Sequence, residues 1–490
     1  MDAHIKQLRA NGKTPQYCRQ VTSAQLGDII ELLLHQHLLS QSQKVDLIAT
    51  ISNILLLNRQ LHASFTSQWS IKVLTYLDSF LAEVVPEIDP AVSPNFLALV
   101  IVYRLVFLIL YDGLPVVKPY VDDTNQILTQ GLRHLFKHYQ TYKNEPYYEN
   151  VTVEILKGLY TLNHKYADQL DASNRISTEE CIEFFVTVVP LSCSSLEPSE
   201  VILVRYFINL ILVVSTQLAL DKSRILDHLK TYQQFLTIVV QLLATNLEDP
   251  DSEEVLSDIT NLFIILNFIT GECNRQNSHG DLDRLVVILK HNIIPTGSPA
   301  HLQSSAQLVE DSSIYQKAFN LIGKSQSSLT QRSIADQLSL SNVTNVILQC
   351  YYNLCFSENQ TQLFLDLIGY GYAKDFMQTN NIAIPSDIEL DSYIQPNPKY
   401  LGKPKDKPPI LDFTDFNHSL SSILLNHTKG TSSEPEEMTK QEKEMEAEKL
   451  FGIFDKMEKS SVFEGFKNPV REWQQSGRFE DLDASDSDKD

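Results

Sequence analysis

Apolar residues recur at spacings of three and four over most of the chain, from about residue 20 to residue 380. Residues 24–60, AQLGDIIELLLHQHLLSQSQKVDLIATISNILLLNRQ, show this spacing in stretches separated by short polar joints. Such spacing places the apolar side chains on one face of an α-helix. Alternating patterns typical of strands are rare, so the pattern predicts an all-α protein built from consecutive helices.

An asparagine recurs within several of these apolar helices, at Asn53, Asn163, Asn209, Asn261 and Asn353. Helical repeats of about 40 residues produce such echoes, because each unit buries its apolar face only against its neighbours. The intervals between these asparagines are irregular. The prediction of an armadillo/HEAT-like repeat domain over residues 1–383 therefore rests on the succession of helical patterns rather than on a regular period. An asparagine in such an array either lines the inner groove or satisfies buried backbone groups, and the sequence leaves both roles open.

Two runs, residues 96–111 and 201–214, are the most apolar parts of the chain. Each contains an arginine, Arg104 in the first and Arg205 in the second. Both runs fall short of the roughly 20 uninterrupted apolar residues that span a bilayer. We therefore expect two helices buried on most sides within a helical stack, and no transmembrane segment.

The texture changes after residue 383. Residues 384–413 hold six prolines, which disfavour helix and favour extended chain. A segment rich in Ser, Thr, Gly and Glu follows, so we expect a Pro-rich and flexible linker over residues 384–437. Residues 480–490 are acidic and are predicted to form a disordered tail.

Between linker and tail, residues 438–479 predict a helical segment that we name the clamp. Thr439 and Glu442 form a capping box that starts the helix. An apolar stripe follows, formed by Ala447, Leu450, Phe451, Phe454 and Met457. An isolated helix of this length is marginal in water. The stripe must therefore dock, either on the repeats or on a partner.

The composition narrows the classes of partner. Among 490 residues the formal net charge is −21, and no cluster of Lys and Arg suited to phosphate contacts is present, which argues against a nucleic-acid binder. An acidic surface favours solubility and basic protein partners. Six scattered cysteines without a CxxC pair are typical of reduced thiols, and the N-terminus lacks the apolar core of a signal peptide. We expect a cytoplasmic protein.

Patterns that would indicate an enzyme are weak. His134 and His138 have the spacing of zinc ligands on a helix, but neither an HExxH arrangement nor a third ligand accompanies them. The stretch AFNLIGKS ends like a phosphate-binding loop, but Ala318 stands where that loop needs its first glycine. The residues predict a binding protein rather than an enzyme, with no catalytic residue, metal or cofactor.

Two passages resemble a known family. The first is FLDLIGYGYAKDFMQTNNIAIP, residues 364–385, and the second is MTKQEKEMEAEKLFGIFDKMEKSSVFEGFKNPVREWQQSGRFEDLD, residues 438–483. In this order, and separated by a Pro-rich linker, they resemble the synembryn family, also called resistance to inhibitors of cholinesterase, and particularly its fungal branch. Residues 104–113 and 156–170 are weaker matches. The family often has an NP-x-TG stretch after the first passage, where this chain reads QPNPKYLGKP.

The resemblance implies an armadillo/HEAT-like superhelix that acts as a folding chaperone and guanine nucleotide exchange factor for the α subunit of heterotrimeric G proteins. It further implies that the concave surface grips the C-terminal helix of the α subunit and that the clamp embraces the GTPase domain. Recruitment to the plasma membrane through this partner, in signalling by G protein-coupled receptors, is implied as well. The expected clamp contacts are Leu450, Phe451, Phe454 and Met457, and the expected groove contacts are Asn53, Arg104, Asn163 and Asn353.

Three serines are candidates for an acid-directed kinase. Ser433 precedes Glu434 and Glu436, whereas Ser485 and Ser487 lie among aspartates. A phosphate on the linker could order it against Arg or Lys, and the resemblance points first to Ser433. The other interpretation of the two terminal serines is an acidic solubilising tail. For the whole protein, the alternative function is a helical-repeat scaffold or transport adaptor that binds other protein cargo.

Overall fold

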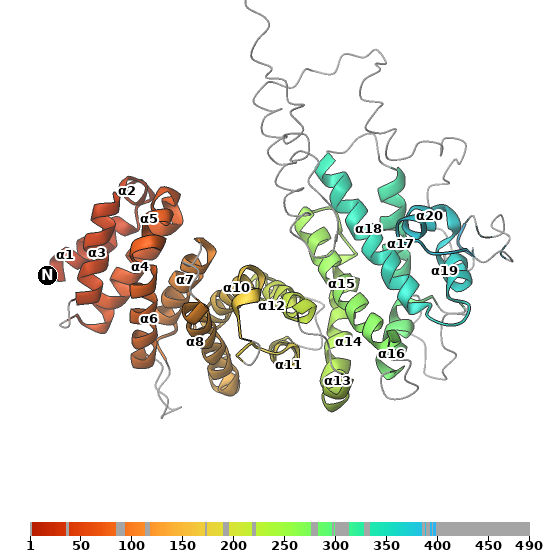
Figure 1. The fold of residues 1–490 in the computed structure, drawn as a ribbon, viewed down its shortest axis with the longest axis horizontal. Helices are drawn as coiled ribbons and strands as arrows, with labels where there is room; N and C mark the ends of the chain where they lie inside the picture. The colour runs from red at the N-terminus through yellow and green to blue at the C-terminus, as the bar shows by residue number, and fades with distance from the viewer. Residues whose placement is uncertain are drawn as a thin grey trace, which may run out of the picture. The chain divides into compact units, whose positions relative to one another are not determined.

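The computed structural model describes most of the chain before residue 398. The described residues are 2–35, 39–84, 94–112, 118–171, 174–189, 196–217, 222–275, 283–295, 298, 313–327, 334–384, 388, 393 and 395–397. Within these ranges every regular element is a helix and no strand occurs (Figure 1). This confirms the predicted all-α helical-repeat class.

The helices follow one another with short connections. The first half of the chain contains α1 (Asp2–Gly12), α2 (Pro15–Gln20), α3 (Ser23–His35), α4 (Gln41–Leu57), η1 (Arg59–Leu61), α5 (His62–Gln68), α6 (Ser70–Val84), α7 (Phe96–Asp112), α8 (Lys118–Lys137), α9 (Tyr139–Tyr142), α10 (Tyr148–Lys165), η2 (Ala167–Gln169) and α11 (Thr178–Val188). The remaining described helices are α12 (Pro198–Gln217), α13 (Lys222–Asp227), α14 (Leu229–Asn246), α15 (Glu253–Arg275), α16 (Asp283–Ile293), α17 (Ser313–Ser327), α18 (Ile334–Leu354), α19 (Gln360–Ile368) and α20 (Tyr370–Thr379).

Contacts within the chain divide it into two compact units. Unit 1 comprises residues 1–321 and 343–403, and unit 2 comprises residues 322–342 and 404–490. Of unit 2, the structure describes the end of α17 and the beginning of α18, both helical. The helical array described below belongs to unit 1.

Unit 1 is built from two layers of helices, which we name layer A and layer B. Layer A contains α4, α7, α10, α12 and α15, each packed against the next, and α18, whose residues bond to α15. Layer B contains α3, α6, α8, α11, α14 and α16. Its contacts run from α3 to α6, α6 to α8, α11 to α14 and α14 to α16, and the Phe136 and Phe184 rings stack 3.9 Å apart between α8 and α11.

The layer-A helices α7 and α10 run parallel to each other. At the beginning of α7 and α10, the rings of Phe96 and Tyr148 lie 6.1 Å apart. At the end of the same helices, Lys165 Nζ donates to the carbonyl of Tyr111 at 2.6 Å. A chain that returns through layer B before each new layer-A helix gives this parallel order, as in helical-repeat proteins.

The core lies between the layers and is rich in aromatic rings. Phe185 of α11 is fully buried, and its ring centroid lies 5.3 Å from that of Phe235 in α14 and 6.0 Å from that of Phe207 in α12. Both pairs are edge-to-face, the geometry that aromatic quadrupoles favour. Burial of each such side chain contributes about 1.5–3 kcal/mol, which ties three helices together.

Two helices begin with a complete capping box. The Ser40 hydroxyl accepts from the N–H of Gln43 at the start of α4, and the Gln43 side chain accepts from the N–H of Ser40. Ser177 and Glu180 repeat this arrangement at the start of α11. Each box satisfies two backbone N–H groups that the first turn of a helix leaves without partners.

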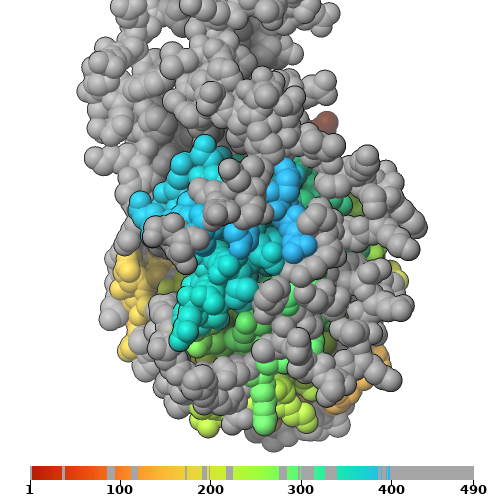
Figure 2. Space-filling view, turned by 90° about the vertical axis from the view of Figure 1, so that its right-hand side faces the viewer, coloured from red at the N-terminus to blue at the C-terminus, as the bar shows by residue number. Residues whose placement is uncertain are grey.

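A sharp elbow joins α19 to α20 in the GYGYA passage. Gly369 has φ of +83°, a backbone conformation that favours glycine, and a Cβ at this position would lie 2.6 Å from the carbonyl carbon of Gln395. The N–H of Asn397 donates to the carbonyl of Asp366 at 3.0 Å. The QPNP stretch, where the sequence departs from the family pattern, thus packs on the elbow. Figure 2 shows the face of unit 1 on which these helices lie, cyan to blue.

The two apolar runs are helices packed within the array. The first is α7, and the second extends beyond the predicted run to form α12, Pro198–Gln217. Among the described helices, Ser199–Thr216 and Glu253–Asn274 are long and apolar enough to cross a membrane by length and composition, whereas Phe96–Tyr111 is shorter. α12 packs on α10, α11 and α15, as a core helix of a stack does.

Several predictions lie outside the described residues. These are the clamp, the tail and nearly all of the linker, so the predicted boundaries at 383, 437 and 479 stay predictions. The five described cysteines are buried, and none of them forms a disulfide within the described part of the chain.

Candidate partner-binding surface

Polar and charged side chains connect several neighbouring helices of layer A, and we name them the polar band. Its members are Arg104 of α7, Glu154 and Lys157 of α10, Arg205 and Asn209 of α12, Asp258, Asn261, Asn267 and Asn274 of α15, and Asn353 of α18. Charged residues inside apolar helices are costly unless they are paired. Each pair described below joins one layer-A helix to a neighbour or to itself.

The first part of the polar band is a carboxylate held between two cations. Glu154 Oε1 accepts from Arg104 Nε at 3.1 Å and lies 3.0 Å from Arg104 Nη2. Its Oε2 lies 2.6 Å from Lys157 Nζ. The Glu154 side chain is 6 % exposed, whereas the Arg104 side chain is 41 % exposed. The arginine therefore neutralises a buried charge and still presents part of its side chain at the surface.

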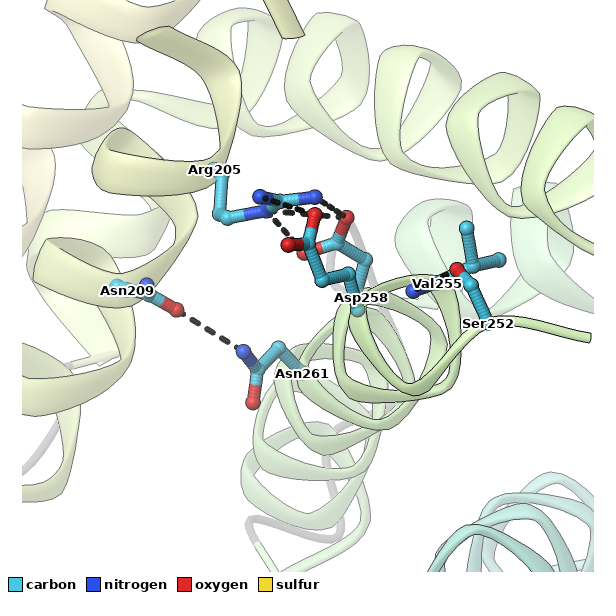
Figure 3. Close-up of polar contacts among 7 residues, drawn as sticks. Arg205, Asn209, Ser252, Val255, Asp258 and Asn261 are labelled. Atoms are coloured by element: carbon cyan, nitrogen blue, oxygen red, sulfur yellow. Dashed lines mark hydrogen bonds and ion pairs between the residues drawn. The ribbon is translucent and has the colours of Figure 1, made fainter. Parts of the chain in front are cut away.

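The second part joins α12 to α15 (Figure 3). The Arg205 guanidinium donates to Asp258 through Nε at 2.9 Å and through Nη2 at 2.8 Å, a bidentate pair. Its Nη1 donates to Glu254 at 3.2 Å. Hydrogen bonding to Asp258, with the added charge of Glu254, raises the pKa of Arg205. This pair explains the arginine inside the second apolar run.

Asparagines continue the band on both sides of α15. Asn261 Nδ2 donates to Asn209 Oδ1 at 2.9 Å, next to the Arg205 pair (Figure 3). Towards α18, Asn353 Nδ2 donates to Asn267 Oδ1 at 3.3 Å, and its carbonyl accepts from Asn274 Nδ2 at 2.8 Å. Because amides both donate and accept, these pairs satisfy one another without a net charge.

Charges from both parts of the polar band act on the hydroxyl of Tyr206 in α12. Burial raises the pKa of its hydroxyl, the charge of Glu154 adds to the rise and Arg205 opposes it. The Glu154 and Arg205 groups therefore act on the same phenol from α10 and α12. The bonded pairs of the polar band join α7 to α10, α12 to α15, and α15 to α18.

The four predicted groove residues all lie on layer-A helices but not at one site. Asn53 of α4 donates to the carbonyl of Gly12 at 3.0 Å, which joins it to the end of α1. Asn163 of α10 is buried, and its Nδ2 donates to the carbonyl of Leu159 in the same helix at 2.8 Å. Of the two roles that the sequence leaves open, Asn163 therefore has the second, bonding to a buried backbone group. Arg104 and Asn353 belong to the polar band. Binding of a partner by any of the four stays a prediction.

The clamp contacts and the serines of the kinase prediction lie outside the described residues. His134 and His138 lie at the end of α8, with ring centroids 4.9 Å apart, and Tyr142 packs beside both. The described residues contain no group of three or more His, Cys, Asp or Glu side chains that could hold a metal ion. The AFNLIGKS stretch forms part of helix α17 rather than a loop.

Sequence reasoning missed the partners of the arginines, although a signal for them is present. The bonded residues are 50 apart between α7 and α10, and 52 and 53 apart between α12 and α15. Between α15 and α18 the interval lengthens to 79 residues because α16 and α17 intervene. The repeat is therefore longer than the expected interval of about 40 residues. A search for opposite charges about 50 residues apart would have found the band.

Comparison with known proteins matches part of the chain to one family. Residues 324–478, about a third of the chain, match the family model described as guanine nucleotide exchange factor synembryn. Residues 324–478 are similar to the synembryn family. This match covers residues 364–385 and most of residues 438–483, the two passages whose resemblance the sequence shows. No curated protein and no solved structure gives a significant match.

The synembryn match and the polar band cover different parts of the chain. The match includes α19, α20 and the elbow at Gly369. The positive φ of Gly369 explains why the GYGYA passage has a glycine at this position. Of the polar band, it includes only Asn353. The match shows similarity of residues 324–478 to a family of guanine nucleotide exchange factors, and the band supplies a candidate surface for a partner.

Substitution of Arg205 tests whether the polar band stabilises the array. Arg205→Met is expected to lower the free energy of unfolding by about 1–2 kcal/mol, because Asp258 is left charged and partly buried without its bidentate partner. Urea unfolding followed by circular dichroism measures this loss. Arg19→Met, at an exposed arginine of α2, is the matched control and should change stability by less than about 0.5 kcal/mol. Equal effects of the two substitutions would contradict a stabilising band.

Proposed function

We propose that this protein is an exchange factor and folding chaperone for the α subunits of heterotrimeric G proteins. The observation that carries the proposal is the match of residues 324–478 to the synembryn exchange-factor family. The same resemblance, in the two passages of the sequence, names the α subunit as partner.

The proposed mechanism is a shift of populations and needs no catalytic side chain. An α subunit exchanges between a closed form that holds GDP and an opened form with an empty nucleotide pocket. A protein that binds the opened form more tightly shifts the equilibrium towards it by its differential affinity. By linkage, the bound protein lowers the affinity of the α subunit for GDP by the same factor by which GDP lowers its affinity for the protein. A coupling of about 3 kcal/mol corresponds to roughly 150-fold.

The chaperone activity follows from the same preference. A binder of the incompletely closed α subunit stabilises that state by mass action, in proportion to its concentration over its dissociation constant. It covers apolar surface that would otherwise aggregate before GTP binds. Removal of this protein from the cell is therefore expected to lower the abundance of the α subunit.

Two parts of the chain are proposed to contact the α subunit. On layer A, Arg104 has a side chain that is 41 % exposed and sits on a helix array that joins α7 to α15. A partner helix could lie across these helices and bond to exposed members of the polar band. In the clamp, Leu450, Phe451, Phe454 and Met457 supply an apolar face for the GTPase domain.

Localisation and regulation complete the proposal. We place the protein in the cytoplasm, with recruitment to the plasma membrane through its α subunit. An acid-directed kinase is proposed to phosphorylate Ser433, Ser485 and Ser487. A phosphate at Ser433 would add a charge of about −1.5 to −2 and could order the linker against a basic residue.

Measurement of GDP release tests the proposed function. Purified α subunit loaded with fluorescent GDP should release it several-fold faster when this protein is added, and a nucleotide-free complex should elute in size-exclusion chromatography. An unrelated helical-repeat protein of similar acidity serves as the control for non-specific charge effects. An unchanged release rate and no complex would remove the proposal, and selective capture of basic targeting peptides would support the scaffold or adaptor function instead.

A further inference from the structure

A pocket lies in unit 1 at the beginning of α10 and α12. It has a volume of about 270 Å³ and shares no residue with the polar band. The turn between α9 and α10, the end of α11 and the beginning of α12 form its walls. The residues that matter for its chemistry are Tyr139, Lys143, Tyr148, Glu149, Glu200 and Leu203. We name it the edge pocket.

Two tyrosines form the aromatic wall of the edge pocket. Their ring centroids lie 6.0 Å apart. Tyr148 is 2 % exposed, and its hydroxyl oxygen is buried. Burial raises the pKa of this hydroxyl, and hydrogen bonding to Thr152 lowers it. Thr152 Oγ1 also donates to the carbonyl of Tyr148 at 3.0 Å. A phenolic oxygen has two lone pairs, so a donor in the pocket can still bond to Tyr148.

The electrostatics of the edge pocket favour a cation. Burial raises the pKa of the Tyr139 hydroxyl, and the charges of Glu149 and Glu200 add to the rise, so both carboxylates act on this one phenol. Glu149 forms no ion pair among the described residues. Glu200 accepts from the N–H of Glu197 at 2.8 Å, which caps α12. Against these two carboxylates stands one ammonium, Lys143, 6.0 Å from the centroid of the Tyr139 ring.

The rim of the edge pocket is apolar. Tyr147 precedes the lining residue Tyr148 and is exposed, and Val201 and Ile202 lie between the lining residues Glu200 and Leu203 and are also exposed. Large apolar side chains exposed beside a pocket mark contact surfaces more often than scattered ones do. A bound side chain whose neighbouring residues in the partner are apolar would cover these exposed side chains.

We propose that the edge pocket binds a lysine or arginine side chain of a protein partner, with Glu149 and Glu200 as counter-ions and apolar neighbours of that side chain on Tyr147 and Ile202. The cation would lie against the Tyr139 ring and donate to the Tyr148 oxygen. Cation–π contacts and charge-assisted hydrogen bonds both strengthen when water is excluded. The net charge of −21 brings basic partners to this surface. This contact is separate from the proposed α-subunit surface and does not depend on it.

A labelled peptide provides the probe. The full-length protein is titrated with a fluorescent peptide that carries one lysine between leucine and valine, and with matched peptides that carry norleucine or glutamate in its place. Fluorescence anisotropy gives the affinities. The lysine peptide is expected to bind at least about tenfold more tightly than the norleucine peptide, as a charge pair in a partly desolvated site does.

Variants connect that preference to the pocket. Glu149→Gln with Glu200→Gln should abolish the preference for lysine, and glutamine at 200 can still accept the capping hydrogen bond. Lys143→Gln, at an exposed position, should instead tighten the lysine peptide several-fold because it removes a like charge. Glu183→Gln with Glu253→Gln removes the same charge from exposed sites elsewhere and should leave the preference intact.

Three results would overturn the proposal. The lysine peptide could bind no better than the norleucine peptide, the glutamate peptide could bind as tightly, or the control variant could lose as much affinity as the pocket variant. Circular dichroism of each variant establishes that the helices are retained. If the double glutamine variant fails to fold, the Lys143→Gln result decides, since loss or no change of affinity there contradicts a cation site.

Discussion

Phe185→Ala is expected to lower the free energy of unfolding by about 3–5 kcal/mol, the usual loss for a fully buried phenylalanine. Phe185 packs edge-to-face on Phe207 and Phe235 and so joins α11, α12 and α14. Removal of its ring leaves a cavity in the core between the two layers and forfeits two aromatic contacts. Because α12 carries Arg205 and Asn209, loosening of this core also disturbs the polar band.

Urea unfolding followed by circular dichroism measures the Phe185 effect. Phe356→Ala, at a phenylalanine that is 45 % exposed, is the matched control and should change stability by no more than about 0.5 kcal/mol. Phe185→Leu should recover part of the loss, since leucine fills part of the cavity. A Phe185→Ala variant as stable as wild type would show that the three helices are not held together at this ring.

Phe451→Ala combined with Phe454→Ala is expected to weaken binding of the α subunit by a few kcal/mol, which is about a hundredfold or more in affinity. The two phenylalanines belong to the apolar stripe of the predicted clamp helix, which cannot bury its face by itself. Large aromatic side chains dominate interface energies. The loss should appear mainly as faster dissociation, because diffusional encounter depends little on two buried rings.

Surface plasmon resonance with immobilised α subunit measures both rates. Phe413→Ala with Phe416→Ala, at two phenylalanines of the predicted linker, is the matched control and should bind like wild type. If the clamp variant binds as tightly as wild type, the stripe packs elsewhere. If the control variant loses as much affinity, the linker contributes to binding and the clamp is not the specific element.

The sequence predicts the class of the fold well because helices are encoded locally. Spacings of three and four fix the apolar face of each helix, and the capping boxes at Ser40 and Ser177 fix two beginnings. The packing of the helices into two layers depends on contacts between helices, which the pattern of a single helix does not encode. Which face of α12 meets α15 depends on Arg205 and Asp258, which are 53 residues apart.

The candidate surface was predictable only in part. Arg104 stands out in the sequence because it is a charge within an apolar run, but its partner Glu154 is one of 61 acidic residues and nothing local distinguishes it. Asn163 looks like the other embedded asparagines, yet burial turns its amide onto its own helix. The edge pocket is invisible in the sequence because its walls come from three separate segments.

The conformation of Gly369 is a structural cause that the sequence motif does not reveal. The GYGYA passage is recognisable as a family feature in the sequence, but only the structure gives its reason. A positive φ and the close approach of Gln395 require glycine at this position. The contacts of the QPNP stretch depend on residues 31 positions away, which local patterns do not encode.

Affinity of this protein for the α subunit, measured with and without saturating GDP, tests the central claim most directly. An exchange factor must bind the nucleotide-free subunit more tightly, so we expect saturating GDP to weaken binding by about 5- to 150-fold, the usual range of a coupling free energy. By the same linkage, the complex should bind GDP more weakly by the same factor. Equal affinity for the empty and the GDP-bound subunit would contradict the account, because such a binder shifts no equilibrium.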